Sequence, residues 1–241
     1  MNLKSLQESI EYRRSVRIFD PNKEIDIEIV KKCIQNAILS PNSSNLQLTE
    51  YYHITSPGLL KKMQYACLKQ NAAKTAKNLL VLVVRRDLIE KRAHWIVEFY
   101  KKLYANELEK KSTKLILAYY TKTVYFMHST GFFGILGFIK YLFVNAMGLS
   151  KAIYRNVRKS DSRIVAHKSA GIAAQSFMLS MASYGYDTCP MEGIDSLRIK
   201  KLLDLPYEAE ICMVIACGIR AEKGIYGPQF RLPLEKVYKE L

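Results

Sequence analysis

The residues near the N-terminus best suited to chemistry are Arg13, Arg14, Ser15 and Arg17, which lie within five positions of one another. Three guanidinium groups and a hydroxyl at this density can bind a dianionic phosphate, because arginine presents paired N–H donors that match phosphate oxygens. The same cluster is also typical of a solvated helix end, where the helix dipole favours basic side chains. By itself it leaves both interpretations open.

Four further polar clusters follow along the chain. They are the loop Pro41-Asn42-Ser43-Ser44-Asn45-Leu46-Gln47, the pair Asn71 and Lys74, the turn Pro190-Met191-Glu192-Gly193, and Gln229 with Arg231 between two prolines. Loops rich in Asn and Ser are usually only turns, and two polar residues one helical turn apart are common on surface helices. The Pro-x-Glu-Gly turn is expected to expose backbone N–H groups beside one carboxylate. Each cluster is ambiguous alone.

Together and in this order, the five clusters resemble the nitroreductase family of FMN-dependent enzymes, and the match covers most of the chain. The corresponding elements are Arg-Arg-Ser-x-Arg, Ser-Pro-x-Ser-x-Asn-x-Gln, Asn-x-x-Lys before a hydrophobic strand, Pro-x-Glu-Gly after a long helix, and a terminal Arg-x-Pro. The resemblance implies an oxidoreductase that uses FMN and NADH or NADPH to reduce nitroaromatic, quinone or related conjugated acceptors by a ping-pong mechanism. It also implies an intertwined homodimer.

The resemblance further implies which residues hold the cofactor. Arg13, Ser15 and Arg231 would hold the FMN phosphate and ribityl chain, Arg17 and Lys74 would approach the pyrimidine side of the ring, and Asn71 would bond its polar edge. A positive group near flavin N1 stabilises the negatively charged reduced ring. The protein orients and tunes the cofactor, which performs the redox chemistry.

The remaining motif residues belong to two other parts of the implied site. Pro41, Asn42, Ser43 and Asn45 would reach the flavin of the partner subunit, and the backbone of Pro190, Met191, Glu192 and Gly193 would lie at the N5 region. Glu192 is the nearest candidate for a catalytic side chain. Two positions depart from the family: Leu48-Thr49 follows Gln47 where Pro-Trp is frequent, and Gln229 replaces a frequent lysine, for which Arg14 can substitute as the phosphate cation.

Hydrophobic spacing predicts the elements that position these groups. Helices are expected over 3–12, 27–39, 59–68, 164–184 and 196–203, and strands over 51–54, 79–84 and 211–217. The helix over 164–184 is rich in small residues, which predicts a central position or a subunit interface. The order of elements indicates a mixed sheet with helices on both faces. The resemblance implies that this is an α+β fold with three α/β/α layers, in which the mixed sheet is largely antiparallel. We expect one domain over 1–241, with a divergent helical insertion or cap over 91–163.

Composition excludes several classes of protein. The five cysteines and four histidines show neither paired nor metal-ligand spacing, so no metal site and no disulfide framework are expected. The N-terminal segment lacks the apolar core of a signal peptide, which favours the cytoplasm. His53, His94, His128 and His167 are expected to be packing or surface residues, and Cys189 a small buried hydrophobe.

The middle of the chain carries most of its net positive charge. Residues 91–168 hold 15 lysines and arginines against four acids, and residues 91–163 hold about half of the aromatics. Nucleic acid, anionic lipid and phosphorylated small molecules all fit such a charge, but no groove-reading or base-stacking motif accompanies it, so no nucleic-acid partner is expected.

An apolar segment lies within this basic region. Residues 132–149 have one charge, Lys140, together with three glycines and Asn145, which disfavours a membrane span and favours a buried or interfacial helix. A second hypothesis is therefore a membrane-surface protein anchored through 132–159, which would be compatible with a flavoprotein that reduces a lipid-soluble acceptor.

Overall fold

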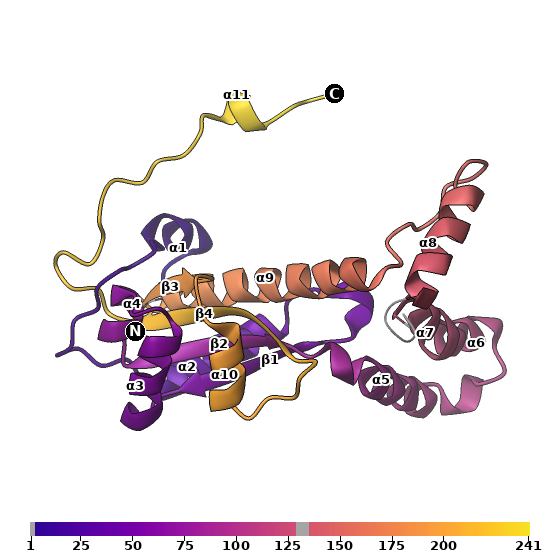
Figure 1. Cartoon of the computed structure of the whole chain (residues 1–241), viewed down its shortest axis with the longest axis horizontal. Coiled ribbons are helices and arrows are strands. Elements are labelled where there is room, and N and C mark those ends of the chain that lie inside the picture. The colour runs from indigo at the N-terminus through magenta and orange to yellow at the C-terminus, as the bar shows by residue number, and fades with distance from the viewer. Residues whose placement is uncertain (1–2, 129–134) are drawn as a thin grey trace.

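A four-stranded sheet lies at the centre of the computed structural model, which describes residues 3–128 and 135–241 (Figure 1). The strands are β1 (Thr49–Ile54), β2 (Asn78–Val84), β3 (Asp187–Met191) and β4 (Glu210–Gly218), in the order β1-β2-β4-β3. Neighbouring strands run antiparallel. Ser15 adds a parallel bridge to Thr188 at the β3 edge. The prediction of a mixed, largely antiparallel sheet is therefore confirmed.

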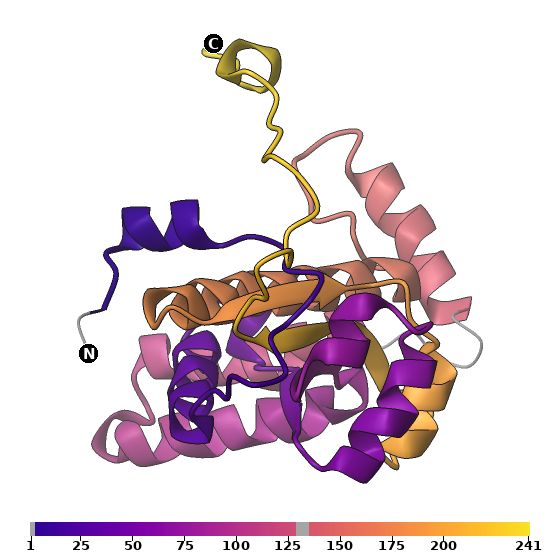
Figure 2. The ribbon, with the colours of Figure 1, turned by 90° about the vertical axis from the view of Figure 1, so that its left-hand side faces the viewer.

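Helices cover both faces of this sheet, as the continuous apolar run of β2 predicts. All seven residues of β2 are buried. Because side chains alternate along a strand, Leu79, Val81 and Val83 pack on one face while Leu80 and Leu82 pack on the other. The first face meets α3 (Pro57–Ala66), α4 (Asn71–Thr75) and α10 (Ser196–Leu202), and the second meets α2 (Ile27–Ile38) and α9 (Lys159–Ser183) (Figure 2).

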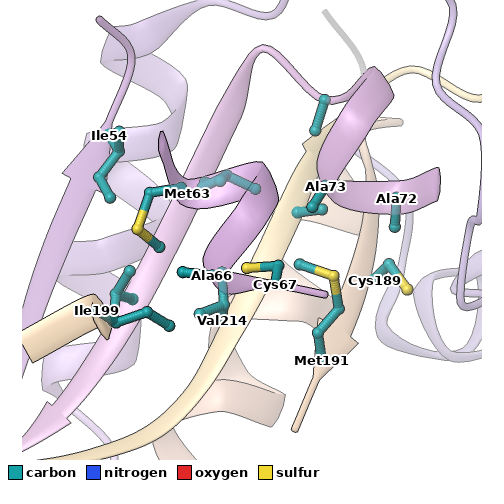
Figure 3. Close-up of a cluster of buried hydrophobic side chains, with 14 of the residues drawn as sticks. Ile54, Met63, Ala66, Cys67, Ala72, Ala73, Cys189, Met191, Ile199 and Val214 are labelled. Carbon is teal, nitrogen blue, oxygen red and sulfur yellow. The ribbon is translucent and has the colours of Figure 1, made fainter. Parts of the chain in front are cut away.

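Small side chains let α4 and the end of α3 approach the sheet closely. Figure 3 shows Met63 and Ala66 of α3 and Ala72 and Ala73 of α4 against the strands. All four are fully or almost fully buried. Since close-packed interiors leave little room for adjustment, this packing fixes the position of the exposed side of α4, which carries two of the predicted site residues.

The N-terminal and C-terminal segments lie beside each other near the β3 edge of the sheet, where Ser15 bridges Thr188 and Arg14 bonds Gly227. Helix α1 (Leu6–Tyr12) begins with a capping box in which Ser5 and Glu8 exchange side-chain and backbone hydrogen bonds. After β4 the chain runs away from the body as an extended segment that ends in the short helix α11 (Leu234–Val237) (Figures 1 and 2). Residues 226–241 are all exposed.

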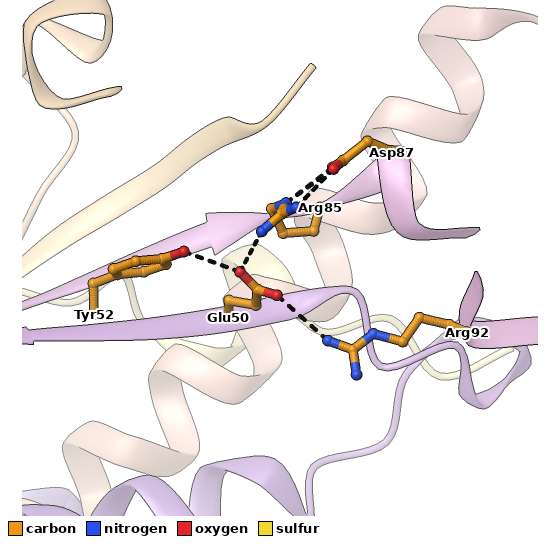
Figure 4. Close-up of polar contacts among 5 residues, drawn as sticks. All are labelled: Glu50, Tyr52, Arg85, Asp87 and Arg92. Atoms are coloured by element: carbon orange, nitrogen blue, oxygen red, sulfur yellow. Dashed lines mark hydrogen bonds and ion pairs between the residues drawn. The ribbon is translucent and has the colours of Figure 1, made fainter. Parts of the chain in front are cut away.

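The helices α5 (Ile89–Leu103), α6 (Lys111–Ala118), α7 (Val124–His128) and α8 (Ile135–Met147) form a helical arm at the opposite side of the molecule from α1 (Figure 1). A polar cluster joins its base to the sheet (Figure 4). Glu50 of β1 accepts a hydrogen bond from Arg85 at 2.7 Å and lies 3.5 Å from Arg92 of α5. Arg85 also pairs with Asp87 at 2.8 Å, and these contacts raise the pKa of Arg85. These contacts therefore hold the base of the helical arm against β1.

For the apolar segment 132–149 the sequence left a buried and an interfacial helix open, and the structure excludes the buried one for α8. The predicted segment 132–149 begins at residues outside the described ranges, but its helical part is described and it is not buried: within α8 only Gly137 and Val144 are buried. Among the described helices, none is both long and apolar enough to cross a membrane.

The half-buried histidine of β1, His53, makes folding stability depend on pH. His53 Nε2 lies 2.9 Å from Asn78 Oδ1, and burial lowers the pKa of His53 because desolvation disfavours the imidazolium. The unfolded chain, with a histidine pKa of about 6.5, binds protons that the folded chain does not, so stability falls as the pH drops through that value. We expect His53→Gln to lose less unfolding free energy than the wild type between about pH 7 and about pH 5 in urea titrations. The exposed His94→Gln control should keep the wild-type slope; equal slopes for all three proteins would contradict the assignment.

Candidate functional site

The segment from Arg13 to Arg17 lies along the exposed edge of β3. The N–H of Val16 donates to Thr188 O at 3.1 Å, and the N–H of Arg17 donates to Gly224 O at 2.7 Å. Gly224 permits this approach, because a Cβ there would lie 2.5 Å from the carbonyl oxygen of Ile18. Arg13 is the C-cap of α1, but the residues that follow it are held between β3 and the segment after β4, so the cluster is more than a solvated helix end.

Three guanidinium groups gather at this edge. Burial lowers the pKa of Arg13, and the positive charges of Arg231 and Arg14 lower it further. Arg14 Nη2 donates to Gly227 O at 2.6 Å, which ties it to the C-terminal segment. Within residues 3–128 and 135–241, no carboxylate pairs with any of these three arginines. The cluster is therefore a positive site without a compensating carboxylate among the described residues, and such a site favours an anion.

A buried ion pair fixes the neighbouring backbone. Asp187 is 2% exposed and accepts hydrogen bonds from the backbone N–H of Arg220 at 2.7 Å and from its Nε at 2.8 Å. The Arg220 guanidinium stacks over the Tyr12 ring at 4.3 Å and donates to the Tyr12 carbonyl at 3.2 Å. The carboxylate thus joins β3, the end of β4 and the residue that precedes Arg13. Sequence reasoning missed this pair, because residues 33 positions apart with no shared motif give no local signal.

The predicted turn at 190–193 begins two residues later than expected. Pro190 and Met191 are the last residues of β3, and Met191 is buried. Proline is tolerated there because β3 is an edge strand. Glu192 and Gly193 are exposed, and within the described chain no protein acceptor receives the N–H of either residue. The expected free N–H groups beside a carboxylate are therefore present.

Helix α4 lies next to this turn and carries the third motif. Gln70, the residue before α4, donates to Gly193 O at 2.8 Å. Asn71 and Lys74 are both exposed, one turn apart, and Asn71 Nδ2 donates to the hydroxyl of Tyr226 at 2.8 Å. The structure thus joins the third, fourth and fifth motifs through Gln70 and Tyr226, neither of which the sequence singled out.

The second motif lies elsewhere. The N–H of Ser43 meets Ser169 Oγ at 3.3 Å, whereas the N-terminal segment meets the other end of α9, where Lys4 N–H donates to Ser183 O at 3.0 Å. These two points on α9 are separated by about 21 Å at the rise of an α-helix. Asn42, Ser43 and Asn45 therefore do not join the arginine cluster within one chain.

The backbone of this loop adopts an uncommon conformation. Ser44, Asn45 and Gln47 have φ values of 53°, 49° and 50°, in the left-handed region that non-glycine residues seldom occupy. Asn42 Oδ1 supports the loop by accepting the N–H of Gln47 at 2.8 Å. Such backbone strain clusters at binding sites, which makes this loop a candidate for function in its own right.

The cysteines form no reactive centre. Burial raises the pKa of Cys189, and Arg17 Nη1 at 3.6 Å from its sulfur opposes that rise. Burial also raises the pKa of the other four, Cys33, Cys67, Cys212 and Cys217. Since the thiolate is the reactive form, we expect a disulfide reagent to modify no thiol rapidly in the folded protein at neutral pH and all five after unfolding. A thiol that reacts fast in the folded wild type and is lost in Cys189→Ser would contradict this.

Several known proteins resemble this chain in sequence and in fold. The chain is 24% identical over 224 residues to "Putative NAD(P)H nitroreductase MhqN" of Bacillus subtilis and 26% identical over 237 residues to Protein DrgA of Synechocystis, with 93% or more of each chain covered. Its fold matches a nitroreductase-type protein of Exiguobacterium sibiricum solved in complex with FMN, with a TM-score of 0.70, 18% identity, and 100% and 99% of the two chains covered. The model of the nitroreductase family matches residues 10–219. The chain belongs to the nitroreductase family.

Proposed function

We propose that this chain is an FMN-dependent oxidoreductase that takes reducing equivalents from NADH or NADPH and passes them to a conjugated acceptor such as a quinone or a nitroaromatic. The observation that carries the proposal is the cluster of Arg13, Arg14 and Arg231: burial lowers the pKa of Arg13, and repulsion from the other two charges lowers it further. A phosphate dianion would relieve that repulsion and accept charge-assisted hydrogen bonds. The names of relatives supply the class of cofactor and reductant: one is named an NAD(P)H nitroreductase, and one neighbour was solved with FMN.

Residues of this chain divide the work of binding. Arg13, Ser15 and Arg231, with Arg14 where the family often has a lysine, would hold the phosphate and ribityl chain. Arg17, Asn71 and Lys74 would contact the polar side of the ring, and the free N–H groups of Glu192 and Gly193 would meet its central edge. FMN, when bound, supplies the redox chemistry, which in a ping-pong sequence serves reductant and acceptor in turn. The exposed carboxylate of Glu192 is our candidate for a side chain near the reacting atoms.

The complete site is proposed to need two copies of the chain. The loop at 41–47 contacts α9 at Ser169, about 21 Å along the helix from Ser183, where the N-terminal segment contacts it, so we propose that the loop reaches the flavin of a partner subunit. The surfaces that a partner would cover are exposed and apolar: Leu6 and Ile10 on α1 are 68% and 46% exposed, and Phe230 of the C-terminal segment is 75% exposed. Burial of such side chains favours association.

The helical arm is proposed to shape the acceptor pocket. A cavity of about 300 Å³ lies between the loop at 41–47 and α5, lined by Asn45, Gln47, Arg92, Trp95 and Phe99 among others. Arg92 Nε is buried without a hydrogen-bond partner among the described residues. Aromatic rings beside a cation suit a planar, electron-poor acceptor. The divergent segment 91–163 would therefore determine specificity.

Reconstitution with FMN tests the proposal. The purified chain should bind FMN, turn yellow, and lose its flavin absorbance anaerobically on addition of NADH or NADPH, whichever it prefers. Addition of a quinone or nitroaromatic should then restore the absorbance. A colourless protein that ignores added FMN would exclude a flavin site, and a flavin that neither nicotinamide reduces would exclude the reductant.

A further inference from the structure

The outward face of α8 is apolar. Ile135, Leu136, Phe138, Ile139, Leu142 and Phe143 are each between 49% and 61% exposed, and at 100° per residue they cover one continuous side of the helix. Gly137 and Val144, on the opposite side, are buried. Lys140 holds the helix to α7 through the carbonyl oxygen and the ring of Phe126. Large exposed apolar patches mark interaction surfaces, so this face needs an occupant.

Basic residues flank that face, and acids are absent from it. From residue 135 to residue 160 the chain contains no aspartate or glutamate and five basic residues, of which Arg158 pairs with the next acid, Asp161, at 3.2 Å; the other four are Lys140, Lys151, Arg155 and Lys159. Arg155 binds the C-terminal end of α8 through Asn145 Oδ1 at 2.8 Å and Gly148 O at 2.7 Å, which keeps the basic segment beside the helix. Lys151 and Lys159 are exposed. The partner that covers this face of α8 should therefore have an anionic surface and an apolar interior.

We infer that α8 docks this protein on the surface of an anionic lipid bilayer, with the helix lying in the plane of the interface. At 13 residues α8 is about 20 Å long, which is too short for a hydrocarbon core of about 30 Å. A helix with aromatic and aliphatic residues on one side and lysine and arginine beside it suits the boundary between headgroups and acyl chains. Anionic headgroups attract the flanking cations within a Debye length of the surface.

A second copy of the chain fits this face less well than a bilayer. If α8 packed on α8 of a partner, the basic segment of one copy would meet the same basic segment of the other, because a twofold interface is formed by the same patch on both sides. Helix α8 also lies at the far side of the molecule from α1 and the start of the C-terminal segment, the surfaces proposed above for the dimer (Figure 1).

Vesicle flotation of the full-length, FMN-loaded protein tests the inference. With vesicles of phosphatidylcholine containing about a third phosphatidylglycerol, most of the protein should float, whereas it should stay in the dense fraction with pure phosphatidylcholine at high salt. The Ile139→Ser/Phe143→Ser variant should lose flotation at least tenfold. The Lys151→Gln/Lys159→Gln variant should bind several-fold more weakly, with a weaker dependence on salt.

Matched controls separate docking from folding. Leu197→Ser/Tyr207→Ser removes two side chains that are even more exposed from another surface, and Lys61→Gln/Lys62→Gln removes two charges from α3; both should float like the wild type. Circular dichroism should be the same for all variants, and flotation follows the protein itself, so a failure of flavin binding would not mimic failure here. A wild type that never floats, or a face variant that floats normally, would overturn the inference. A wild type that stays dense while the face variant lowers the oligomeric state in sedimentation velocity would assign α8 to a contact between copies instead.

Discussion

The variant Arg13→Gln/Arg231→Gln is expected to bind FMN at least about 100-fold more weakly than the wild type, measured by equilibrium titration of flavin fluorescence. A hydrogen bond to a charged group contributes about 1.5–3 kcal/mol, and the variant removes two such groups from the phosphate side. Riboflavin, which lacks the phosphate, should bind the wild type and the variant with similar affinity. This comparison isolates the phosphate as the group that the arginines recognise.

Stability in the absence of cofactor distinguishes a binding role from a structural one. Because Arg231 and Arg14 lower the pKa of Arg13 by repulsion, removal of two of the three charges should leave the melting temperature of the apoprotein unchanged or raise it. The control Arg198→Gln changes an exposed arginine of α10 that pairs with Asp195 at 2.9 Å, and it should leave FMN affinity unchanged. If Arg13→Gln/Arg231→Gln kept wild-type affinity for FMN, the phosphate site would have to lie elsewhere.

Much of the fold follows from local patterns in the sequence. The six apolar residues Leu79–Val84 are too few for a buried helix and are buried on both faces, as a strand covered by two helical layers requires. Helix α2 begins after its N-cap, Asp26, and ends before Pro41, because a proline disfavours helical geometry in the residue that precedes it. These features depend on neighbours in sequence, which a single chain reveals.

The solvent exposure of α8 could not be predicted in the same way. Its residues are apolar on nearly every side, and hydrophobic periodicity then indicates burial without saying against what. Only the folded chain shows that Val144 faces inward while Phe143, one position away, lies 61% exposed. Packing against the rest of the folded chain therefore determines which residues of α8 are exposed, and the hydrophobic pattern of the helix alone does not.

The candidate site shows the same division. Motif order predicts which residues would hold a cofactor, and the structure places Arg231 close enough to Arg13 for its charge to lower the pKa of Arg13. The links between the later motifs are long-range contacts with no motif of their own: Gln70 to Gly193 at 2.8 Å and Asn71 to Tyr226 at 2.8 Å. Single amide and hydroxyl side chains occur throughout any sequence, so their partners become apparent only in three dimensions.

Among the substitutions proposed here, we expect the loss of the Asp187–Arg220 ion pair to lower the free energy of unfolding the most. Asp187→Ala would leave the Arg220 guanidinium, which is 28% exposed, without its carboxylate and would remove the acceptor of the Arg220 backbone N–H. Loss of one partner from a buried ion pair costs about 3–5 kcal/mol, because the remaining charge stays desolvated. We expect a loss of that size in urea unfolding. The N-terminal arginine cluster should also become more mobile. In the variant Asp187 no longer holds the Arg220 guanidinium over the ring of Tyr12, the residue that precedes Arg13.

Replacement of both partners should reverse most of that loss. Asp187→Leu/Arg220→Met leaves no buried charge, and apolar replacements of buried ion pairs are often neutral or stabilising. Glu109→Ala, which breaks the exposed pair with Lys114, serves as the control and should unfold like the wild type, since exposed ion pairs contribute little. If Asp187→Ala also unfolded like the wild type, the pair would not fix this edge of the sheet. If the double variant regained stability but not FMN affinity, the pair would act beyond stability, by orienting the backbone that presents Arg13.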